Sequence, residues 1–336
     1  MLVLVIALCA CSVPNANPDT GCEPGQDTGL AANGPHVVTD QAGRSVAVNG
    51  PVGRIVSGYY ISSSACIALG LTDRMVGIEA KAEKRNIYAL AAPELLRLPN
   101  VGTAKEFNLE GCVALKPDLV ILPVHLRENA DILAGLGIAA ILVNPEGYDE
   151  LLEMIALIGD AAGVGERAER LIDYYVGMRF AIDELTAKLA DRPVVYMCGV
   201  GSYLTTAPKG MYQSSLIEIA GGQNAARDID SNGWTPVSYE QLLSMDPEVI
   251  VIPSEAGYDK EDILNDAQLA SLTAVAKGRV YRMPGDYEAW DSPVPSSVLG
   301  MLWLINTLHG DVYTLETLRS DVTEFYSDFY GIRLAP

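Results

Sequence analysis

The apolar positions along the chain recur with two different periods, and their alternation predicts an α/β fold. Short runs that are apolar at every position, such as LVIL within 118–123 and VIVI within 248–253, are typical of strands buried on both faces of a parallel sheet. Between such runs, apolar residues spaced three or four positions apart predict helices that cover the sheets. The segment 36–50 instead alternates around the turn sequence DQAG, which predicts an antiparallel hairpin.

The other expected elements follow from the same two patterns. We expect further strands at 54–58, 75–79, 139–144, 194–199 and 279–284. We expect a helix at 63–71 that is capped by its serines, and further helices at 109–115, 131–137, 214–222, 296–309 and the C-terminus.

The longest helical pattern covers residues 164–191. Its apolar positions recur at three- and four-residue steps, at Ala168, Leu171, Ile172, Tyr175, Met178, Ile182, Leu185 and Leu189. This stripe predicts one continuous helix of roughly 40 Å, at about 1.5 Å per residue. We therefore expect an N-terminal lobe at 36–160, a bridging helix within 161–192 and a C-terminal lobe at 193–336.

One unit of sequence occurs twice. NLEGCVALKPDLVILP (108–123) aligns without a gap with SYEQLLSMDPEVIVIP (238–253), so that Glu110 matches Glu240 and Pro117 matches Pro247. The repeat predicts two similar α/β lobes, each containing the same helix–turn–strand unit. Two facing lobes form a cleft, and open α/β sheets bind ligands beyond the carboxyl ends of their strands.

The chain is long enough for two domains and is strongly acidic. It has 336 residues, of which 49% are hydrophobic and 20% are charged, and its formal net charge is −20. These values are typical of a folded protein of two domains. Because phosphate binding needs a basic surface, the charge excludes nucleic acid as a partner.

The N-terminus has the features of an export signal. Its apolar run, in MLVLVIALCACS, is too short to span a bilayer as a helix. The sequence LCAC, which ends at Cys11, resembles the lipobox of bacterial lipoproteins and predicts a signal peptide at 1–10 and a lipid on Cys11. Residues 11–35 are rich in Pro, Gly, Asn and Asp, which predicts a tether. We expect an exported lipoprotein, in the periplasm or at the cell surface, that is anchored to a membrane through Cys11.

The cysteines and histidines do not have the spacing of metal ligands. Cys66, Cys112 and Cys198 lie in apolar runs and are expected to be small buried residues, although an exported protein permits one disulfide among them. The sequence predicts no bound metal and no resident cofactor.

Six segments, in order, make the chain from about residue 36 resemble a known family. They are VVTDQAGRSV, GRIVS, NLEGCVALKPDLVIL, LIEIAGGQNAA, VSYEQLLSMDPEVIVI and WDSPVPSSVLGMLWL. These segments are similar to those of class III periplasmic solute-binding proteins, which have a helical backbone and serve iron–siderophore, haem and cobalamin ABC importers. The resemblance implies two lobes with mainly parallel sheets, a largely preformed cleft between them and modest closure on the ligand.

The resemblance also implies partners. In the family, a glutamate at the start of each repeated helix pairs with arginines of the permease, and the matching residues here are Glu110 and Glu240. The alternative is a pair of solvated glutamates that favour the helix dipole. We expect a monomer that binds an ABC permease with its ATPase and carries a small-molecule metal chelate.

Aromatic and basic residues on loops at the strand ends are the candidates for ligand contacts. Tyr and Trp rings stack on bulky ligands, and arginine suits catecholate, carboxylate or oxyanion groups. The expected cleft residues are Tyr59, Tyr60, Arg85, Arg127, Tyr203, Trp234 and Trp290. Each of them could instead serve ordinary packing.

The resemblance and the candidate ligand contacts favour some cargoes and functions over others. A ferric siderophore is the first expected cargo, followed by cobalamin or haem, and an oxyanion such as molybdate or tungstate is the alternative that Lys84, Arg85 and Arg127 support. A chelatase-like enzyme of related two-lobed architecture is a further alternative. The chain has no nucleophile elbow, no glycine-rich phosphate loop and no cysteine cluster for iron–sulfur ligation, so we do not expect an enzyme.

Overall fold

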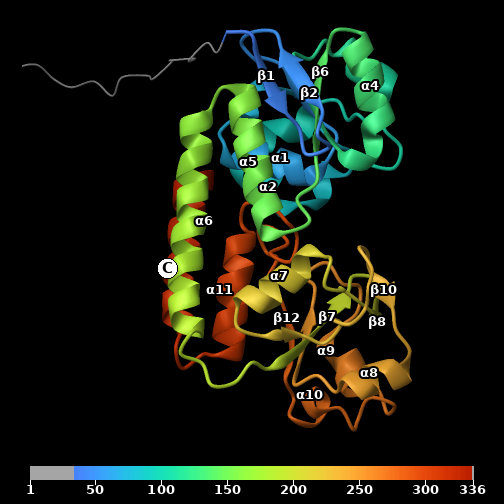
Figure 1. The fold of residues 1–336 in the computed structure, drawn as a ribbon, viewed down its shortest axis with the longest axis vertical. Helices are drawn as coiled ribbons and strands as arrows, with labels where there is room; N and C mark the ends of the chain where they lie inside the picture. The colour runs from blue at the N-terminus through green and yellow to red at the C-terminus, as the bar shows by residue number, and fades with distance from the viewer. Residues whose placement is uncertain (1–33, 335–336) are drawn as a thin grey trace, which may run out of the picture. The chain divides into compact units, whose positions relative to one another are not determined.

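Two α/β lobes are joined by a long helix, α6 (Gly165–Thr186), as the sequence predicts (Figure 1). The structure is a computed structural model that describes residues 34–334, and these belong to one compact unit, Ala32–Pro336. The expected signal peptide, Cys11 and nearly all of the tether lie outside the described residues. Within the described part, no helix combines the length and the apolar character needed to cross a membrane.

The N-terminal lobe comes first along the chain. Its strands are β1 (His36–Thr39), β2 (Ser45–Val48), β3 (Ile55–Ser57), β4 (Met75–Gly77), β5 (Leu119–Pro123) and β6 (Ala139–Val143). Its α-helices are α1 (Tyr60–Ala68), α2 (Asn86–Ala91), α3 (Leu109–Ala114), α4 (Arg127–Gly135) and α5 (Tyr148–Ala162). Short 3₁₀ helices are η1 (Thr72–Arg74), η2 (Ala82–Lys84), η3 (Pro93–Arg97) and η4 (Val124–Leu126).

The C-terminal lobe follows α6. Its strands are β7 (Val194–Gly199), β8 (Ser202–Thr206), β9 (Gln223–Asn224), β10 (Thr235–Pro236), β11 (Val249–Ile252) and β12 (Val280–Arg282). Its helices are α7 (Tyr212–Ile219), α8 (Tyr239–Met245), α9 (Lys260–Leu264), α10 (Thr273–Ala276), α11 (Ser297–Leu308) and α12 (Leu315–Tyr330).

The two main sheets share one strand order. The N-terminal sheet is parallel throughout, in the order β4-β3-β5-β6, and the C-terminal lobe repeats this order in its parallel strands β9-β7-β11-β12. Mainly parallel sheets are therefore confirmed, as is the antiparallel hairpin of β1 and β2. The antiparallel strands β8 and β10, which extend the C-terminal sheet past β7, were not predicted.

The repeated sequence unit folds in the same way in both lobes. Helix α3 with β5 and helix α8 with β11 are its two copies. The residue before each proline has the same unusual backbone: Lys116 has φ +49° and Asp246 has φ +38°. A left-handed residue ends the helix, and the proline after it prevents a further turn. Each copy therefore turns from helix to strand at the same place.

The acidic residue after each proline connects the unit to the neighbouring strand. Asp118 accepts a hydrogen bond from the backbone N–H of Gly53 at 2.9 Å, and Glu248 accepts one from that of Val194 at 3.2 Å. Asp118 and Glu248, which align in the repeat, therefore make the same kind of contact in both lobes.

Helix α6 is continuous but shorter than predicted. It ends at Thr186, before the expected end at residue 191, and its 22 residues span about 33 Å at about 1.5 Å per residue. Beyond it, the N–H groups of Lys188 and Leu189 bond to carbonyls three residues back, so the chain tightens into a 3₁₀-like turn before Pro193. The predicted stripe is confirmed, because Ala168, Leu171, Tyr175 and Ile182 are its buried positions.

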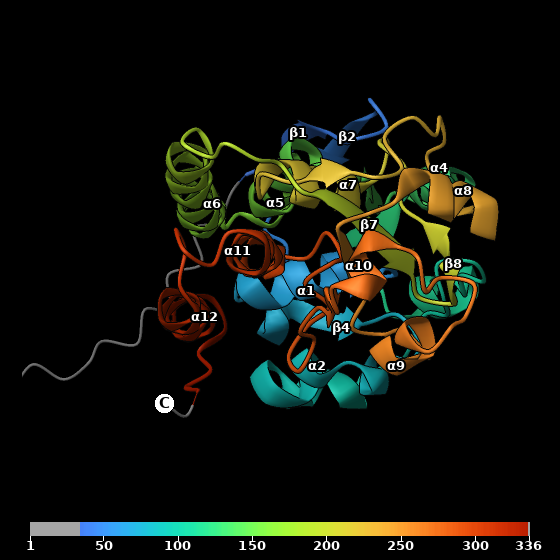
Figure 2. The same ribbon diagram turned by 90° about the horizontal axis from the view of Figure 1, so that it is seen from below.

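One hydrophobic core connects the two lobes. It continues from the strands of the N-terminal lobe through α5, α6 and α11 to β7 and α7. Figures 1 and 2 show α6, α11 and α12 side by side at one edge of the protein. Cys66, Cys112 and Cys198 are buried and free, so no disulfide forms among these three cysteines.

The serines at the start of α1 have a different role from the predicted cap. The helix begins at Tyr60, and no side chain caps it. Ser62, Ser63 and Ser64 instead lie within the first turns, fully buried, and their hydroxyls bond to polar groups of the core. Buried hydroxyls need such partners, and two of these partners are carboxylates at the cleft.

Candidate functional site

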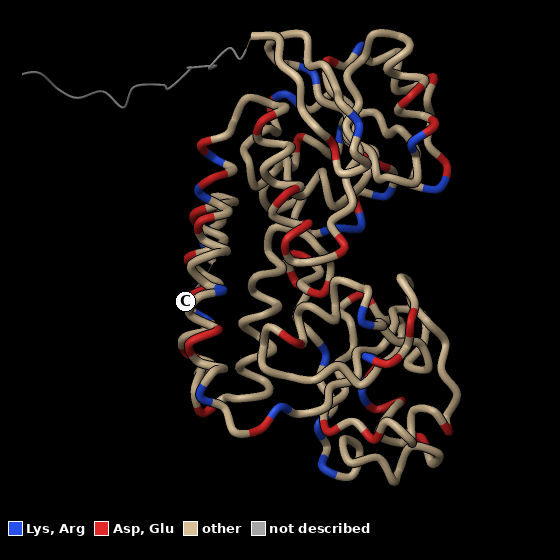
Figure 3. The backbone as a smooth tube through the Cα atoms, in the orientation of Figure 1, with Lys and Arg blue, Asp and Glu red and all other residues tan. Residues whose placement is uncertain are grey.

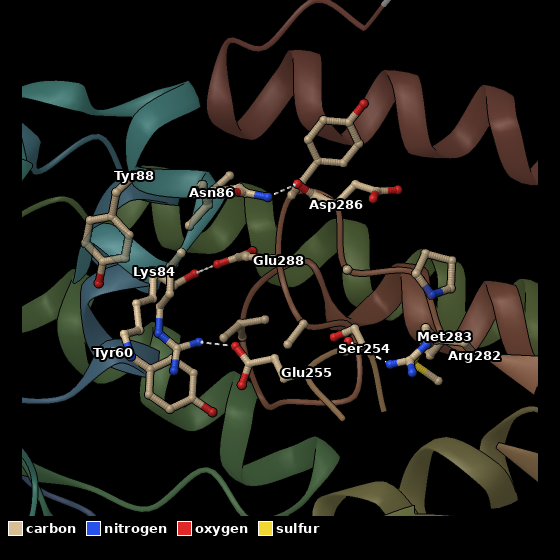
Figure 4. A pocket seen from close by; sticks show the side chains of 18 residues that line it. Tyr60, Lys84, Asn86, Tyr88, Ser254, Glu255, Arg282, Met283, Asp286 and Glu288 are labelled. Carbon is tan, nitrogen blue, oxygen red and sulfur yellow. Dashed lines mark hydrogen bonds and ion pairs between the residues drawn. The ribbon is translucent and has the colours of Figure 1, made fainter. Parts of the chain in front are cut away.

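A cavity of about 430 Å³ lies between the lobes, beyond the carboxyl ends of β11 and β12. Tyr60, Ser64 and residues 84–88 line it from the N-terminal lobe, and residues 254–255 and 282–289 line it from the C-terminal lobe. Figure 4 shows the two groups of side chains facing each other. Open α/β sheets bind their ligands in this position.

A second cavity, of about 480 Å³, adjoins the first on the side of the N-terminal lobe. Its further lining comes from residues 58–59, 79–81 and 103–104. Both cavities are lined by Tyr60, Lys84, Arg85 and Glu255. We refer to these four residues as the partition, because they lie between the two spaces.

Arg85 is the central group of the partition. Its guanidinium carbon lies 3.6 Å from the centroid of the Tyr60 ring, and its Nη1 lies 3.2 Å from Oε1 of Glu255. The stacking fixes the plane of the guanidinium, and the ion pair connects the two lobes. In Figure 4, the Glu255 carboxylate points across the cavity to this partner.

Three further contacts hold the lobes together around the first cavity. The Tyr60 hydroxyl donates to Oγ of Ser292 at 3.1 Å, and Nδ2 of Asn86 donates to the carbonyl oxygen of Asp286 at 2.9 Å. The Ser64 hydroxyl donates to Glu288. The cavity is thus bounded by direct contacts between side chains of both lobes.

Two buried carboxylates lie in the cavity walls. Glu79 accepts from Ser63 and Tyr88 beside the second cavity, and Glu288 accepts from Ser64, Ser296 and Tyr330 beside the first. Burial raises the pKa of both carboxyl groups, and these hydroxyls and Arg85 oppose only part of that rise. The hydroxyls donate to both oxygens of each carboxyl group, and neither group forms an ion pair within residues 34–334.

A set of oxygen atoms without partners lies beneath the first cavity. Oγ of Ser254, Oδ1 of Asp291 and Oε1 of Gln213 are buried and have no hydrogen-bond partner among the described residues. Gln213 donates through Nε2 to the Asp291 carbonyl oxygen at 2.8 Å. Burial, with a smaller contribution from Glu255, raises the pKa of Asp291 to about 6. Ser254 lines the cavity, but its Oγ is itself buried.

The basic residues of the cavity differ in how far they are engaged. Arg282 donates to the carbonyl oxygens of Pro253, Ser254 and Ala256 and pairs with Asp259 at 2.8 Å, so it serves the loop after β11. Lys84 is exposed and has no ion-pair partner among residues 34–334. Figure 3 shows basic residues interspersed with acidic ones over both lobes. Lys84 and Arg85 are the cationic side chains that line both cavities, and Lys81 adds a third cation to the lining of the second cavity.

Three of the predicted cleft residues line the cavities. Tyr60 and Arg85 belong to the partition, and Tyr59 lines the second cavity, with its ring 5.4 Å from that of Tyr60. Burial, with Tyr60 and Glu146, raises the pKa of Tyr59, so its hydroxyl stays protonated.

The structure places the other four predicted cleft residues elsewhere. Arg127 is exposed at the first turn of α4, and Trp234 is 37% exposed on the loop before β10. Tyr203 donates to Asp266 within the C-terminal lobe. Trp290 is buried, and its indole N–H donates to the Tyr326 hydroxyl at 3.0 Å. None of the four lines either cavity, and the prediction that Trp290 contacts the ligand is corrected to a core position.

Several lining residues were not among the predicted cleft residues. Glu255 follows β11, and the repeat places it at the strand end where a ligand is expected, although its role as a contact was not predicted. Glu79 and Glu288 gave no such signal, because nothing in the local sequence distinguishes a buried glutamate from an exposed one. Among the described residues, no group of three His, Cys, Asp or Glu side chains could hold a metal ion.

Glu110 and Glu240 occupy the same position in their helices. Each lies exposed in the first turn, after an N-cap residue whose side chain accepts from a backbone N–H: Asn108 from Gly111 at 2.9 Å, and Ser238 from Gln241 at 3.2 Å. Hydrogen bonding to Ser238 and to the backbone lowers the pKa of Glu240. Two caps thus hold two exposed carboxylates on short, rigid helices.

Comparison with known proteins connects the fold to a family. The family model described as "Periplasmic binding protein" matches residues 55–287. Molybdate-binding protein MolA of Haemophilus influenzae is 26% identical over 328 residues, which cover 89% of this chain and 92% of that protein. The Fe(3+)-citrate-binding protein YfmC of Bacillus subtilis is 26% identical over 86% of this chain and 88% of its own length.

Solved structures show the same fold. A periplasmic solute-binding protein from Veillonella parvula aligns with a TM-score of 0.78 and 28% identity, over 90% of this chain and 94% of that one. MolA bound to molybdate aligns with a TM-score of 0.79 and 24% identity, over 90% of this chain and 99% of that one.

Proposed function

The chain belongs to the periplasmic binding protein family, and we propose that it is the substrate-binding component of an ABC importer. The protein captures its cargo between the lobes and delivers it to a permease and its ATPase. It acts by binding, without turnover. Glu110 and Glu240 contact the permease. A lipid on Cys11 holds the exported protein, as a monomer, at the membrane.

The cargo that the site favours is a small oxyanion of the molybdate and tungstate class. The observation that carries this choice is the pair of cationic side chains at the wall of the first cavity. Arg85 and Lys84 both line this space of about 430 Å³, and Arg85 is held in place by Tyr60 and Glu255. Guanidinium, ammonium and hydroxyl groups are the donors that bind oxyanions. The similarity to MolA over nearly the whole chain supports the same class.

A ferric chelate is the second candidate, and the second cavity favours it. Tyr59 and Tyr60 bring two rings to that space, and Arg85 adjoins them. Aromatic rings and a guanidinium suit the ligand shell of a ferric siderophore or of ferric citrate. Such a chelate fills both cavities and requires the partition to open, and cobalamin or haem requires a wider opening still.

Calorimetric titration of the purified protein tests the choice. The panel is molybdate, tungstate, ferric citrate, a ferric catecholate siderophore, haem and cobalamin, each at the same ionic strength. We expect molybdate and tungstate to bind with one ion per chain, and sulfate at the same concentration to bind far more weakly. Binding of a chelate with no heat from either oxyanion would select the second candidate, and no binding by any member would remove the cleft as a site for this cargo.

A further inference from the structure

Glu255 lies where an anionic group of the cargo would bind. Its carboxylate accepts from Nη1 at the edge of the Arg85 guanidinium, from the side of the C-terminal lobe, while the Tyr60 ring covers one face of that group. Lys84, which has no ion-pair partner among the described residues, belongs to the same partition. An anion that enters either cavity therefore meets an Arg85 whose Nη1 already donates to Glu255.

The surroundings let the Glu255 side chain leave without a change in the backbone. Arg282 holds the carbonyl oxygens of Pro253, Ser254 and Ala256, so the loop on both sides of Glu255 is fixed. The Glu255 side chain is 50% exposed and has solvent to turn into, whereas the side chain of Arg85 is only 26% exposed and is stacked in place. The arginine is the fixed member of the pair and the glutamate is the movable one.

Electrostatics favours an exchange over simultaneous binding. A ligand anion next to Glu255 would place two negative charges on one guanidinium in a partly buried site, and like charges at this range repel. Asp286 and Glu288 line the same cavity and add to that repulsion. Once Glu255 turns out, Nη1 of Arg85 is released to the ligand, and the two cavities lose the carboxylate that lies between them.

We propose that Glu255 is an internal competitor for the cargo: its carboxylate pairs with Arg85 in the empty protein and is displaced when an anionic ligand binds. The proposal rests on the proposed function, since it requires an anionic cargo in this cleft. Glu255 then lowers the affinity for the ligand by stabilising the empty protein. Capture of the ligand breaks the ion pair between the lobes.

Replacement of Glu255 tests the competition. Molybdate, and ferric citrate in parallel, are titrated calorimetrically into the wild-type protein and into Glu255→Gln, which keeps the shape of the side chain without its charge. A partly exposed ion pair of this kind contributes little to stability, so its loss should tighten ligand binding by about two- to fivefold. Asp286→Asn is the matched control. It removes the same charge from the same wall without touching Arg85, and it should change the affinity less than Glu255→Gln does.

A double variant separates the ion pair from general electrostatics. In the Arg85→Met background the competitor has no partner, so adding Glu255→Gln should change the affinity no more than Asp286→Asn does in the wild-type protein, which is the effect of a lost wall charge alone. Unchanged or weaker binding by Glu255→Gln alone, in a protein that binds the anion as wild type, overturns the proposal and leaves the proposed function standing. A wild-type protein that binds neither anion refutes the proposed function, and the competition with it.

Discussion

Tyr175, on the bridging helix, connects that helix to the start of α11. Its hydroxyl donates to the carbonyl oxygen of Pro295 at 2.8 Å, lies 3.0 Å from Oγ of Ser297, and accepts from the backbone N–H of Val298 at 3.2 Å. No side chain of α11 caps its own first turn. The Tyr175 hydroxyl therefore takes the place of an N-cap and holds the first turn of α11 against α6.

Tyr175→Phe should destabilise the protein by about 2–3 kcal/mol. The change keeps the ring in the core but leaves the Val298 N–H and the Pro295 carbonyl without this partner, and a buried polar group left unpaired costs roughly 1–3 kcal/mol. The neighbouring Tyr174 supplies the control. Its hydroxyl is buried without a partner among the described residues, and its ring packs 5.4 Å from the rings of both Phe325 and Phe329. Tyr174→Phe should therefore be neutral or slightly stabilising.

Urea unfolding measures both changes. The unfolding free energies of the wild-type protein and of the two variants are compared by circular dichroism and by tryptophan fluorescence, so that separate unfolding of the lobes would be noticed. The expected order is Tyr174→Phe at or above wild type, and Tyr175→Phe clearly below it. Equal stabilities of the two variants would refute the capping role of Tyr175.

The remaining predictions concern pH, uptake and affinity. Burial raises the pKa of Asp291 from 3.8 to about 6, so the folded protein keeps a proton that the unfolded chain releases. The free energy of unfolding then falls as the pH rises from about 4 to above 6. At about 1.4 kcal/mol per pKa unit, the wild-type protein should lose about 3 kcal/mol more than Asp291→Asn over this range. Parallel pH profiles of the two proteins would contradict this. Glu110→Ala combined with Glu240→Ala should abolish uptake into cells and leave the calorimetric affinity intact, and normal uptake would exclude the docking role. Arg85→Met should weaken molybdate binding about 10- to 100-fold, the range expected for a charged hydrogen bond, while Arg127→Met should bind as wild type.

The parts of the fold that were predicted are those with a regular pattern. The stripe of α6 and the repeated unit both place apolar residues at fixed intervals, and a fixed interval determines which face is buried. The two copies of the repeat also share a left-handed backbone conformation at Lys116 and Asp246, and in both copies a proline follows directly. The early end of α6 was not predicted because residues 187–191 contain nothing that excludes a helix. The helix ends because the chain leaves it toward Pro193 and β7.

The site was only partly predictable, because its residues come from loops that meet through tertiary contacts. Arg85 and Tyr60 were found because a loop at a strand end is the expected place for a ligand. Trp290 was predicted to contact the ligand because its neighbours Asp291 and Pro293 are typical of an exposed loop. The segment instead packs closely against α11. A Cβ atom on Gly300 would lie 2.4 Å from the Trp290 carbonyl oxygen, so this glycine permits a contact that sequence composition does not reveal.

The position of a bound heavy oxyanion shows whether the cargo binds between the lobes at Arg85. In crystals grown with tungstate, the anomalous scattering of tungsten locates the ion independently of the electron density of the protein. We expect one strong peak per chain between the lobes, within hydrogen-bond distance of the Arg85 guanidinium, with the Glu255 carboxylate turned away. A peak outside the cleft, or a cleft that stays empty with the Arg85–Glu255 pair intact while tungstate binds elsewhere, would contradict it.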